Sequence, residues 1–600
     1  MNSRGGSMSW VMKRGNRQKP KNVKYVLKRL WDYLAKFKWW LILALILMIL
    51  SNLFSLIGPK LLGEAIDAMR IEENGIKYVD FDKVFLYASL MAIFYLLSSI
   101  FLYFLRRLII KISKKIVYKM REDAFDKMMI LPISYFDTNL IGDIISKISY
   151  DIDTINASLS NDVISIVTSM ITIIGSLAMM IIIEWRLIVV FIFTIPISLL
   201  FTRFMLRKTK SLFKERSYRL GMLNGYVEEA ITASKTIKAY SKEDKIIEIF
   251  DEHNDISTDA SYKAEYYGAI TGPGVNFINN LSMTLICILG SIYLILGYIS
   301  TGDLASFVTY SRRFSGPINE IANIFIDIQS ALAAGERVFE LIDATPEIVD
   351  SDYAIEVECS GKVEFIDVCF GYKKEVPIFR NLNFETYPGE VIAIVGPTGA
   401  GKTTIVNLLM RFYDIDSGEI KLDNVQIKDI KRRKLRENYA MVLQDTWLFE
   451  ASVMDNLLYG ASDVTKDDVI NACKEAKIHS FIMSLPQGYD TILTEGGTNI
   501  SKGQKQLLTI ARAMMLKRKM LILDEATSNV DTRTEKQITA AMRHLMSDKT
   551  CFIIAHRLST ISNADLILVI SNGEIVEKGK HQELLDKGGF YKELYYSQFD

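Results

Sequence analysis

Long runs of apolar residues are concentrated before residue 330, and the pattern changes after it. Six runs are long enough to cross a bilayer as helices, which takes roughly 20 residues each. These predicted spans are about 39–61, 84–105, 163–183, 187–205, 277–299 and 304–328. Later apolar runs shrink to about five residues, as in strands that are buried on both faces of a parallel sheet. The pattern predicts a six-helix transmembrane domain followed by an α/β domain.

Basic residues orient the predicted spans. Residues 1–38 contain eleven Lys or Arg residues and a single acid, Asp32, so this end is expected in the cytosol. Trp39 and Trp40 then mark the inner membrane interface and Trp185 the outer one. A nucleic-acid interpretation of the basic start is disfavoured because the net charge of the whole chain is only +1. A secretion-signal interpretation fails because the first run is too long and no A-x-A-like site follows it.

Alternating spans separate short outer loops from long inner segments. The outer loops are 62–83, 184–186 and 300–303, and the inner segments are about 106–162 and 206–276. The inner segments are rich in Lys and Arg and helical in pattern, so the spans are expected to continue beyond the membrane as helices. The predicted domains are a disordered basic N-terminus over 1–22, the transmembrane domain over 23–330, a linker over 331–360 and the α/β domain over 361–600.

A glycine-rich loop lies between a predicted strand and a predicted helix. Gly396 to Thr403 reads G-P-T-G-A-G-K-T, directly after the apolar run Val391 to Val395. In this context the pattern is typical of a loop whose backbone N–H groups surround phosphates, with a helix N-terminus pointing at the same anion. Lys402 would reach the β- and γ-phosphates, and the Thr403 hydroxyl would hold Mg²⁺. The loop predicts binding of a nucleoside triphosphate without saying how it is used.

Polar residues at the ends of other apolar runs supply candidate chemistry. The run Met520 to Leu523 ends in Asp524 and Glu525. An acid at this position can orient Mg²⁺ through its water, and a second acid can polarise the attacking water. Two further polar residues, His556 and Gln444, each follow another apolar run. The histidine could contact the γ-phosphate, and the glutamine could bond both Mg²⁺ and the water.

The segment Asn499 to Gln506, N-I-S-K-G-Q-K-Q, resembles the L-S-G-G-Q signature of ATP-binding cassette (ABC) ATPases. The whole chain resembles a B-subfamily-like multidrug half-transporter, which implies the type IV exporter fold and ATP hydrolysis coupled to transport, with ATP and Mg²⁺. The resemblance assigns ATP binding to Tyr372 (under adenine), Gly396, Pro397, Thr398, Gly399, Ala400, Gly401, Lys402, Thr403, Thr404 and Gln444. It assigns catalysis to Lys402, Glu525 and His556, and Mg²⁺ to Thr403, Gln444 and Asp524.

In this family two cassettes close head to tail, so each ATP site takes its phosphate loop from one cassette and its signature from the other. The resemblance therefore assigns to the partner's ATP the signature residues Ser501, Lys502, Gly503 and Gln504, with Asp531 in the D-loop. Leu131 to Asp153 and Leu223 to Tyr240 resemble the two intracellular loops whose coupling helices dock on the cassettes. The coupling residues would be Tyr135, Phe136, Asp137, Gly142, Asp143, Asn224 and Gly225.

Lys502 departs from the family, because the first signature glycine is expected there. A side chain at this position could displace the backbone that contacts the partner's ATP and impair hydrolysis. By contrast, the catalytic acid that the family requires is present in this chain as Glu525. Ser528 to Asp531 reads S-N-V-D in place of the commoner S-A-L-D, which likewise indicates one member of a heterodimer. The sequence favours a heterodimer with a different chain that has an intact signature and a substituted catalytic acid; a homodimer that tolerates the lysine stays open.

The expected function is ATP-driven export of amphipathic compounds by alternating access across the plasma membrane of a bacterium, with membrane lipids and an amphipathic small molecule as partners and no nucleic acid. Alternatives of the same fold are a homodimeric lipid flippase, a peptide exporter and an ATP-gated channel. An alternative of another class is a soluble cassette ATPase of DNA maintenance, which would share the nucleotide motifs without the spans.

Three further features bear on this function. Arg312 and Arg313 lie inside the sixth span, where charge is expensive, so they could select anionic ligands or pair with Glu320 or the other subunit. The basic segment Lys428 to Arg436 is typical of a solvated helix face. The five cysteines form no C-x-x-C pair, which indicates neither a metal site nor a disulfide framework.

Overall fold

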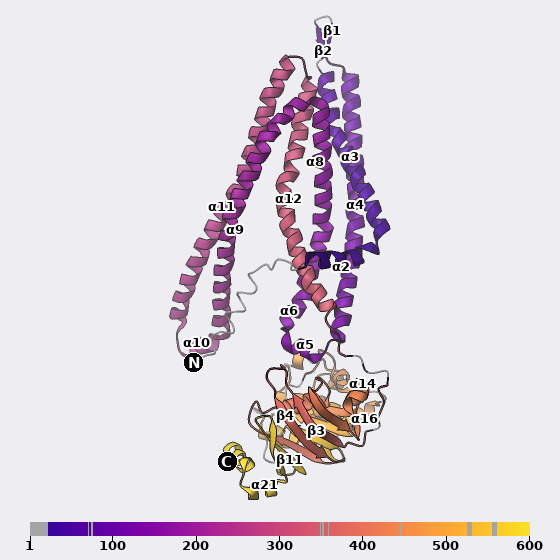
Figure 1. The fold of residues 1–600 in the computed structure, drawn as a ribbon, viewed down its shortest axis with the longest axis vertical. Coiled ribbons are helices and arrows are strands. Elements are labelled where there is room, and N and C mark those ends of the chain that lie inside the picture. Colours follow the sequence, from indigo (N-terminus) through magenta and orange to yellow (C-terminus); the bar gives the residue numbers. More distant parts are fainter. Residues whose placement is uncertain are drawn as a thin grey trace. The chain divides into compact units, whose positions relative to one another are not determined.

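The protein is described by a computed structural model, shown in Figure 1. It describes residues 22–599 apart from short gaps. The residues outside the description are 1–21, 70, 74–75, 349, 351–352, 358, 444–446, 462–463, 498, 525–530, 555–560 and 600. The chain divides into two compact units, Met1–Ile130 with Leu140–Thr345, and Leu131–Asn139 with Pro346–Asp600. The segment Leu131–Asn139 therefore packs with the second unit, although the sequence pattern places it within the transmembrane domain.

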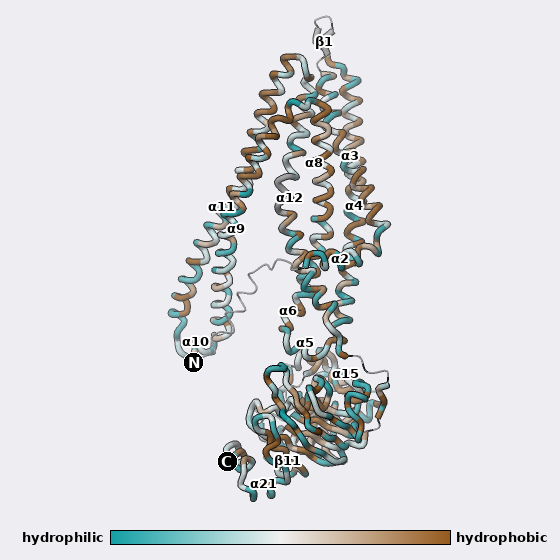
Figure 2. The backbone as a smooth tube through the Cα atoms, viewed as in Figure 1, coloured by the Kyte–Doolittle hydropathy of each residue, from teal (hydrophilic) through white to brown (hydrophobic). Residues whose placement is uncertain are grey.

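The first unit is almost entirely helical. Its long helices are α2 (Val23–Ala35), α3 (Lys38–Ala68), α4 (Phe81–Met129), α8 (Val163–Glu184), α9 (Val189–Thr232), α11 (Glu243–Ile295) and α12 (Thr301–Ile342). Shorter elements are the hairpin β1 (Ile71–Glu73) and β2 (Ile76–Tyr78), and the helices α6 (Ile141–Ser146), α7 (Ile152–Ala157) and α10 (Ser234–Ala239). Hydrophobic residues gather along these helices, which Figure 2 shows for α3, α4 and α8.

Four stretches of helix among the described residues are long and apolar enough to cross a membrane: Lys38–Ala68, Phe81–Met129, Ile141–Thr232 and Glu243–Ile295. The third stretch holds two predicted spans, because a 3-10 turn at Trp185–Ile188 separates α8 from α9. The predicted sixth span lies in α12, whose charged residues, Arg312 and Arg313 among them, make it less apolar. Each predicted span thus coincides largely with a helix.

Helices α4, α9 and α11 are much longer than a membrane is thick. They contain 49, 44 and 53 residues. At about 1.5 Å per residue, each is at least roughly twice as long as the 30 Å hydrocarbon core of a bilayer. The pair α9 and α11 run side by side and are joined by α10, near which the chain turns hydrophilic (Figure 2). Their lengths agree with the prediction that the spans continue beyond the membrane as helices.

The second unit contains two sheets. The larger has the strand order β12-β11-β5-β10-β9-β8 and is parallel except between β11 and β12; the smaller, β4-β3-β6-β7, is antiparallel. The strands are β3 (Val363–Phe370), β4 (Phe379–Thr386), β5 (Val391–Val395), β6 (Ser417–Leu422), β7 (Val425–Gln426), β8 (Tyr439–Val442), β9 (Met520–Asp524), β10 (Thr550–Ile554), β11 (Leu566–Ser571) and β12 (Glu574–Gly579). Its helices are α5 (Ile133–Thr138), α13 (Lys402–Leu409), α14 (Arg432–Glu437), α15 (Val453–Leu458), α16 (Lys466–Glu475), α17 (His479–Ser484), α18 (Lys502–Met515), α19 (Thr532–Met546), α21 (His581–Lys587) and α22 (Phe590–Phe599).

The larger sheet divides two hydrophobic cores, because successive side chains of a strand point to opposite faces. In β5, Ile392 and Ile394 pack in the core shared with β3, β4 and α13, whereas Ala393 and Val395 pack in the core shared with α18 and α19. Burial on both faces explains why β5, β9 and β10 appear in the sequence as continuous apolar runs. The predicted α/β architecture of this part is confirmed.

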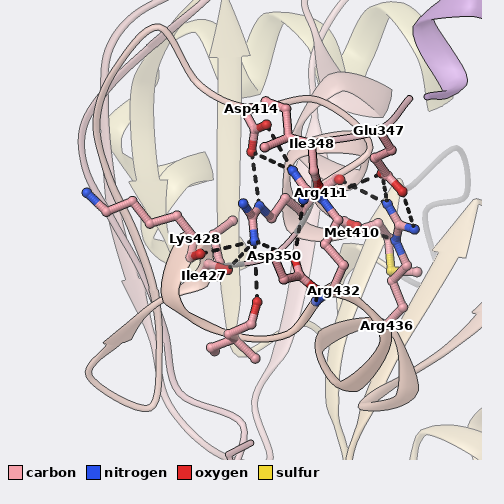
Figure 3. A network of polar contacts seen from close by, with 11 residues as sticks. Glu347, Ile348, Asp350, Met410, Arg411, Asp414, Ile427, Lys428, Arg432 and Arg436 are labelled. Atoms are coloured by element: carbon pink, nitrogen blue, oxygen red, sulfur yellow. Dashed lines mark hydrogen bonds and ion pairs between the residues drawn. The ribbon is translucent and has the colours of Figure 1, made fainter. Parts of the chain in front are cut away.

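A buried polar network corrects one interpretation of the sequence (Figure 3). The segment 428–436 has the composition of a solvated helix face, but Arg432 in α14 is only 6% exposed. Its guanidinium pairs with Asp350 at 3.2 Å and with Asp414 at 3.0 Å. Arg411 is 7% exposed and donates to Asp414 and to backbone carbonyls of 427–430. These charges can be buried because each one is paired and hydrogen-bonded.

Two acids of the predicted linker, 331–360, take part in the same network. Arg436 of α14 pairs with Glu347 at 2.6 Å (Figure 3), and Asp350 is paired within the network. These two acids therefore belong to the second unit, whose larger segment begins at Pro346. The first part of the predicted linker, up to Ile342, is the end of α12.

Candidate nucleotide site

The glycine-rich loop leaves the carboxyl end of β5 and enters α13. Its path requires glycine at two positions. Gly401, the N-cap of α13, has a φ of 101°, which residues with a Cβ rarely adopt. A Cβ on Gly396 would lie 2.3 Å from the carbonyl oxygen of Ile570. The loop can therefore pass close to β11 and turn into the helix only with these glycines.

The N-terminus of α13 is open for an anion. No side chain caps it, because the N-cap is Gly401. The Lys402 ammonium donates to the carbonyl oxygens of Gly396 at 2.8 Å and Pro397 at 3.1 Å. Burial lowers the pKa of Lys402, and the attraction of Asp524 opposes this in part. Free N–H groups beside a half-buried cation fit a phosphate chain, so these residues meet the requirements of the predicted ATP site.

The remaining loop residues differ in exposure. Thr398, Gly399 and Thr403 are exposed, whereas Ala400 and Thr404 are buried. The exposed Thr403 hydroxyl at the start of α13 and the Asp524 carboxylate at the end of β9 would hold Mg²⁺. When bound, the ion neutralises phosphate charge. Phosphate and water oxygens, together with Gln444, would complete the set of ligands. No group of three or more His, Cys, Asp or Glu residues that could hold a metal ion is found among the described residues.

Three predicted catalytic and metal residues, Gln444, Glu525 and His556, lie outside the described residues, as does the segment 528–530 of the D-loop. The strands that precede them are described, and β8, β9 and β10 are parallel neighbours in one sheet. Parallel strands bring their carboxyl ends to one edge, where the glycine-rich loop also begins. The roles of these residues stay predictions from the sequence.

Hydrogen bonds and aromatic contacts hold Tyr372, the predicted adenine platform. Its hydroxyl donates to Thr404 Oγ1 at 3.3 Å and accepts from Asn407 Nδ2 at 2.9 Å. Its ring meets Phe370 and Tyr413 edge-on, with ring centroids 5.1 and 4.8 Å apart. The side chain is still 45% exposed, which leaves surface for stacking on a base.

Tyr413 connects this platform with the first coupling helix, α5. Its hydroxyl donates to the Asp137 carboxylate, and both residues belong to the second unit. Burial and this carboxylate raise the pKa of Tyr413, so the phenol stays a hydrogen-bond donor. The sequence pointed to Asp137 and Tyr372 but not to Tyr413 or Asn407, because an isolated tyrosine and asparagine outside any motif carry no recognisable signal.

The other predicted coupling residues lie in three helices. They are Tyr135 and Phe136 in α5, Gly142 and Asp143 in α6, and Asn224 and Gly225 in α9. The two aromatic rings of α5 meet edge-on with centroids 5.8 Å apart. In contrast, α10, which forms the turn of the second loop, has no buried residue. Of these coupling residues, Tyr135, Phe136 and Asp137 lie in Leu131–Asn139, which belongs to the ATPase unit of the same chain.

The signature segment forms the start of α18. Ser501 is its N-cap: the hydroxyl accepts from the backbone N–H of Gln504 at 3.3 Å, and the Gln504 side-chain oxygen accepts from the backbone N–H of Ser501 at 2.8 Å. Lys502 is the first helical residue and is exposed, and Gly503 is buried. Asp531 caps α19 through a backbone N–H at 3.0 Å, a bond that lowers the pKa of its carboxyl. Lysine at the first position is thus compatible with a regular helix.

Comparison with known proteins identifies the family. The family model for the ABC transporter transmembrane region matches residues 41–318, and the model for the ABC transporter matches residues 379–528. The uncharacterized ABC transporter ATP-binding protein YfiC of Bacillus subtilis (strain 168) is 41% identical over 585 residues, which are 97% of this chain and 96% of that protein. The chain belongs to the ABC transporter family.

Two further comparisons support the assignment of this ABC transporter. The fatty acid ABC transporter ATP-binding/permease protein of Mycobacterium bovis is 40% identical over 516 residues, 86% of this chain and 82% of that protein. The structure of a bacterial Atm1-family ABC exporter with ATP bound matches with a TM-score of 0.75 and 28% identity, over 94% of this chain and 99% of that chain. Most of the length of each chain is covered.

The transporter is therefore a bacterial ABC exporter of the type IV fold, with a helical membrane domain followed by a cytosolic ATPase domain. Its ATPase domain binds ATP with Mg²⁺ and couples hydrolysis to transport. One membrane domain and one ATPase domain make a half-transporter, and ABC exporters work as dimers. These findings confirm the family, fold, enzyme class, cofactors and membrane location predicted from the sequence.

Proposed function

We propose that this half-transporter exports amphipathic compounds by alternating access, driven by closure of two ATPase domains over ATP. The observation that carries the coupling is the contact between Tyr413 and Asp137. The Tyr413 ring lies 4.8 Å from that of Tyr372, while its hydroxyl holds α5. A base that stacks on Tyr372 therefore acts on the residue that holds the first coupling helix. Nucleotide binding can shift the membrane helices only through such differential contacts.

The residues divide the work of hydrolysis. Lys402 and the open N-terminus of α13 hold the phosphates. Glu525 is assigned the role of general base on the attacking water, and His556 is assigned the contact with the γ-phosphate. Once phosphate has left, the contacts across the closed dimer weaken and the membrane helices reset.

The name of one similar protein supports an amphipathic substrate. A protein 40% identical over most of its length is named a fatty acid ABC transporter. A homodimeric lipid flippase or a peptide exporter is the alternative within the same fold. The alternative of a soluble ATPase of DNA maintenance lacks support, because residues 41–318 match a transmembrane region.

A different chain as the partner is supported by Lys502. The residue is exposed at the N-terminus of α18, the surface that the family presents to the partner's ATP. With the lysine there, the site built from this signature would hold ATP and hydrolyse it slowly. The site built from this chain's Lys402, Asp524 and Glu525 would turn over. Brisk, cooperative ATPase activity of this chain purified alone would contradict the heterodimer.

The test of coupled export is substrate uptake into inverted membrane vesicles. Glu525→Gln is expected to keep ATP binding, to lower turnover by roughly 100-fold or more, and to abolish uptake against a gradient. Glu574→Gln, an exposed acid at the start of β12, is the matched control and should transport normally. Uptake that continues unchanged in Glu525→Gln would show that hydrolysis does not drive transport; downhill flux alone in the parent protein would indicate a channel.

A further inference from the structure

Two neighbouring arginines of α12 have different surroundings. Arg313 Nη1 donates to the backbone oxygen and to the hydroxyl of Ser55 in α3, both at 2.7 Å. Ser55 lies four residues before Pro59, which has no N–H to donate, so the helix leaves this carbonyl without its usual partner. Arg313 supplies the missing donor. It therefore joins α12 to α3 and has a structural role.

One stripe of α12 is fixed on α3 by similar bonds. The hydroxyls of Ser306 and Tyr310 donate to further carbonyls of α3, at 2.8 and 2.6 Å. With Arg313, these residues recur at the spacing of one helix face. Arg312 points away from this face, because successive residues of a helix are about 100° apart. Its side chain is exposed in the single chain.

Arg312 lacks the strong partner that its neighbour has. Its Nε lies 3.2 Å from the Met283 sulfur in α11, and a thioether is a weak acceptor. It forms no ion pair with any residue whose side chain the structure describes, a set that leaves out Glu320. It comes eleven residues after α12 begins at Thr301, so at about 1.5 Å per residue it lies near the middle of a bilayer core. A charge at this depth normally faces a cavity or binds a counter-charge.

Three amides share a face of α11 with Met283, the residue that Arg312 contacts. Asn276, Asn279 and Asn280 lie seven, four and three residues before Met283 in α11, on the same face of that helix. None of the three side-chain amides hydrogen-bonds to another described residue. Together with Arg312 they form what we call the Arg312 patch, a set of hydrogen-bond donors around one positive charge.

There is room beside the patch. A Cβ added to Gly316, one helical turn after Arg312, would meet no atom within 4 Å. Gly316 is exposed like Arg312, so the two positions share one open stripe of α12. A small head group could occupy this space and contact the guanidinium.

We propose that the Arg312 patch binds the anionic head group of the exported amphiphile, and that this head group is a carboxylate on a hydrocarbon chain. The proposal rests on the proposed export of amphipathic compounds and names their charge. A guanidinium matches a carboxylate with two parallel hydrogen bonds, and the amides can donate to the remaining lone pairs. A monoanion balances the single positive charge of the patch, and the hydrocarbon chain lies among the apolar side chains of the membrane helices.

The experiment uses the complete transporter, purified from its own membrane and reconstituted in uncharged lipid. ATPase stimulation is measured with four probes of equal chain length: dodecanoate, dodecyl phosphate, dodecanol and dodecyltrimethylammonium. Dodecanoate is expected to act at a lower half-maximal concentration than dodecanol. Arg312→Gln should raise the half-maximal concentration of dodecanoate by about tenfold or more, and should not raise that of dodecyltrimethylammonium. Arg312→Lys should keep part of the preference, because the charge stays and the paired geometry is lost.

Two variants serve as controls. Gly316→Leu fills the open space and should weaken both anionic probes. Arg313→Gln should lower the unfolding temperature and leave the ratio of dodecanoate to dodecanol half-maximal concentrations unchanged, since its guanidinium holds a backbone carbonyl.

Each contrary outcome has a separate meaning. If Arg312→Gln weakens all four probes alike, or mainly dissociates the dimer, the arginine pairs with the partner subunit and the proposal is overturned. If dodecyl phosphate outperforms dodecanoate in the parent protein, the carboxylate assignment is wrong. If no probe stimulates the parent protein, export of amphiphiles itself fails, whereas equal stimulation by all four probes defeats only the charge preference.

Discussion

The ATPase unit has two helix N-termini that the family assigns to phosphates, and they are built differently. Helix α13 begins after Gly401 without a side-chain cap, and Lys402 lies across its loop. Helix α18 begins after Ser501, whose hydroxyl forms a complete capping box with Gln504. The first N-terminus has no side-chain acceptor on its N–H groups and can offer them to phosphate. The second is already satisfied within its own chain.

This difference indicates an order of events. The open end of α13 can take up nucleotide in a single subunit, because no side-chain cap must be displaced there and only the Lys402 ammonium has to exchange its bonds to the loop carbonyls. If α18 meets the partner's phosphate as the family assigns, its capped end has to exchange hydrogen bonds of the cap for bonds to that phosphate. A cap of this kind is worth about 1 kcal/mol, so the exchange is inexpensive once the domains close. We expect ATP to bind first at α13 and the signature to engage at closure.

The largest expected effect comes from removing the charge at α13. Lys402→Met takes away the ammonium beside the open N–H groups and should weaken ATP binding by roughly 100-fold or more. Lys466→Met is a matched control, because Lys466 also occupies the first position of a helix, the capped α16. Its nucleotide affinity should equal that of the parent protein. Titration of the purified transporter with a fluorescent ATP analogue measures both, and unchanged affinity in Lys402→Met would contradict the contrast.

The contrast between the two termini was only partly predictable from the sequence. A glycine-rich loop after an apolar run specifies its own geometry locally, so Gly401 and Lys402 could be assigned without a structure. The membrane helices were predictable for the same reason, because length and hydropathy are local properties. The capping box of Ser501 and Gln504 has a recognisable spacing, yet the match to a family signature drew attention to the partner's ATP instead.

Long-range contacts could not be predicted from the sequence. Arg313 bonds to Ser55 across 258 positions, and no local pattern distinguishes it from Arg312. Arg432 belongs to a segment with a solvated composition but is buried, because Asp350 and other acids distant in sequence neutralise it. Such pairings depend on tertiary packing, which a single sequence does not encode in any local pattern.

The second largest effect is expected at the capped terminus. Ser501→Ala removes the hydroxyl that caps α18 and that would meet the partner's phosphate, so turnover should fall between about tenfold and 100-fold while ATP affinity stays the same. Stability should fall by about 1 kcal/mol. Thr465→Ala removes an equivalent cap from α16 and provides the control. It should lose the same stability and keep its turnover, as measured by chemical unfolding and phosphate release.

Equal loss of turnover in Ser501→Ala and Thr465→Ala would mean that the hydroxyl of Ser501 acts only as a cap. This chain would then give no support for a contact between α18 and the partner's phosphate. Helices α13 and α18 would differ only in how their N-termini are stabilised.

A smaller effect is expected from restoring the family residue at the first position of α18. Lys502→Gly removes an exposed side chain from the surface that the family assigns to the partner's ATP. If the lysine slows hydrolysis there, turnover of the assembled transporter should rise severalfold, up to about tenfold, with no change in ATP affinity. The glycine costs helix stability of up to about 1 kcal/mol. Turnover that stays the same or falls would show that the lysine is tolerated, as a homodimer requires.

The smallest effect is expected from pH, and it concerns α13. Burial lowers the pKa of Lys402 below its ordinary value of 10.5, so the folded, nucleotide-free protein disfavours the charged form. The free energy of unfolding without nucleotide should therefore rise with pH between the lowered pKa and 10.5. In this range the unfolded chain still binds a proton at Lys402 that the folded protein has released.

The affinity for ATP should change in the opposite direction. ATP binding needs the ammonium, so affinity should fall over the same range, by at most about tenfold per pH unit. Titrations at alkaline pH up to 10.5 measure the slope, and Lys402→Arg is the control because its guanidinium stays charged. If the pH dependence is the same in the parent protein and in Lys402→Arg, a group other than Lys402 titrates. The charge of Lys402 would then not explain phosphate binding at the open N-terminus of α13.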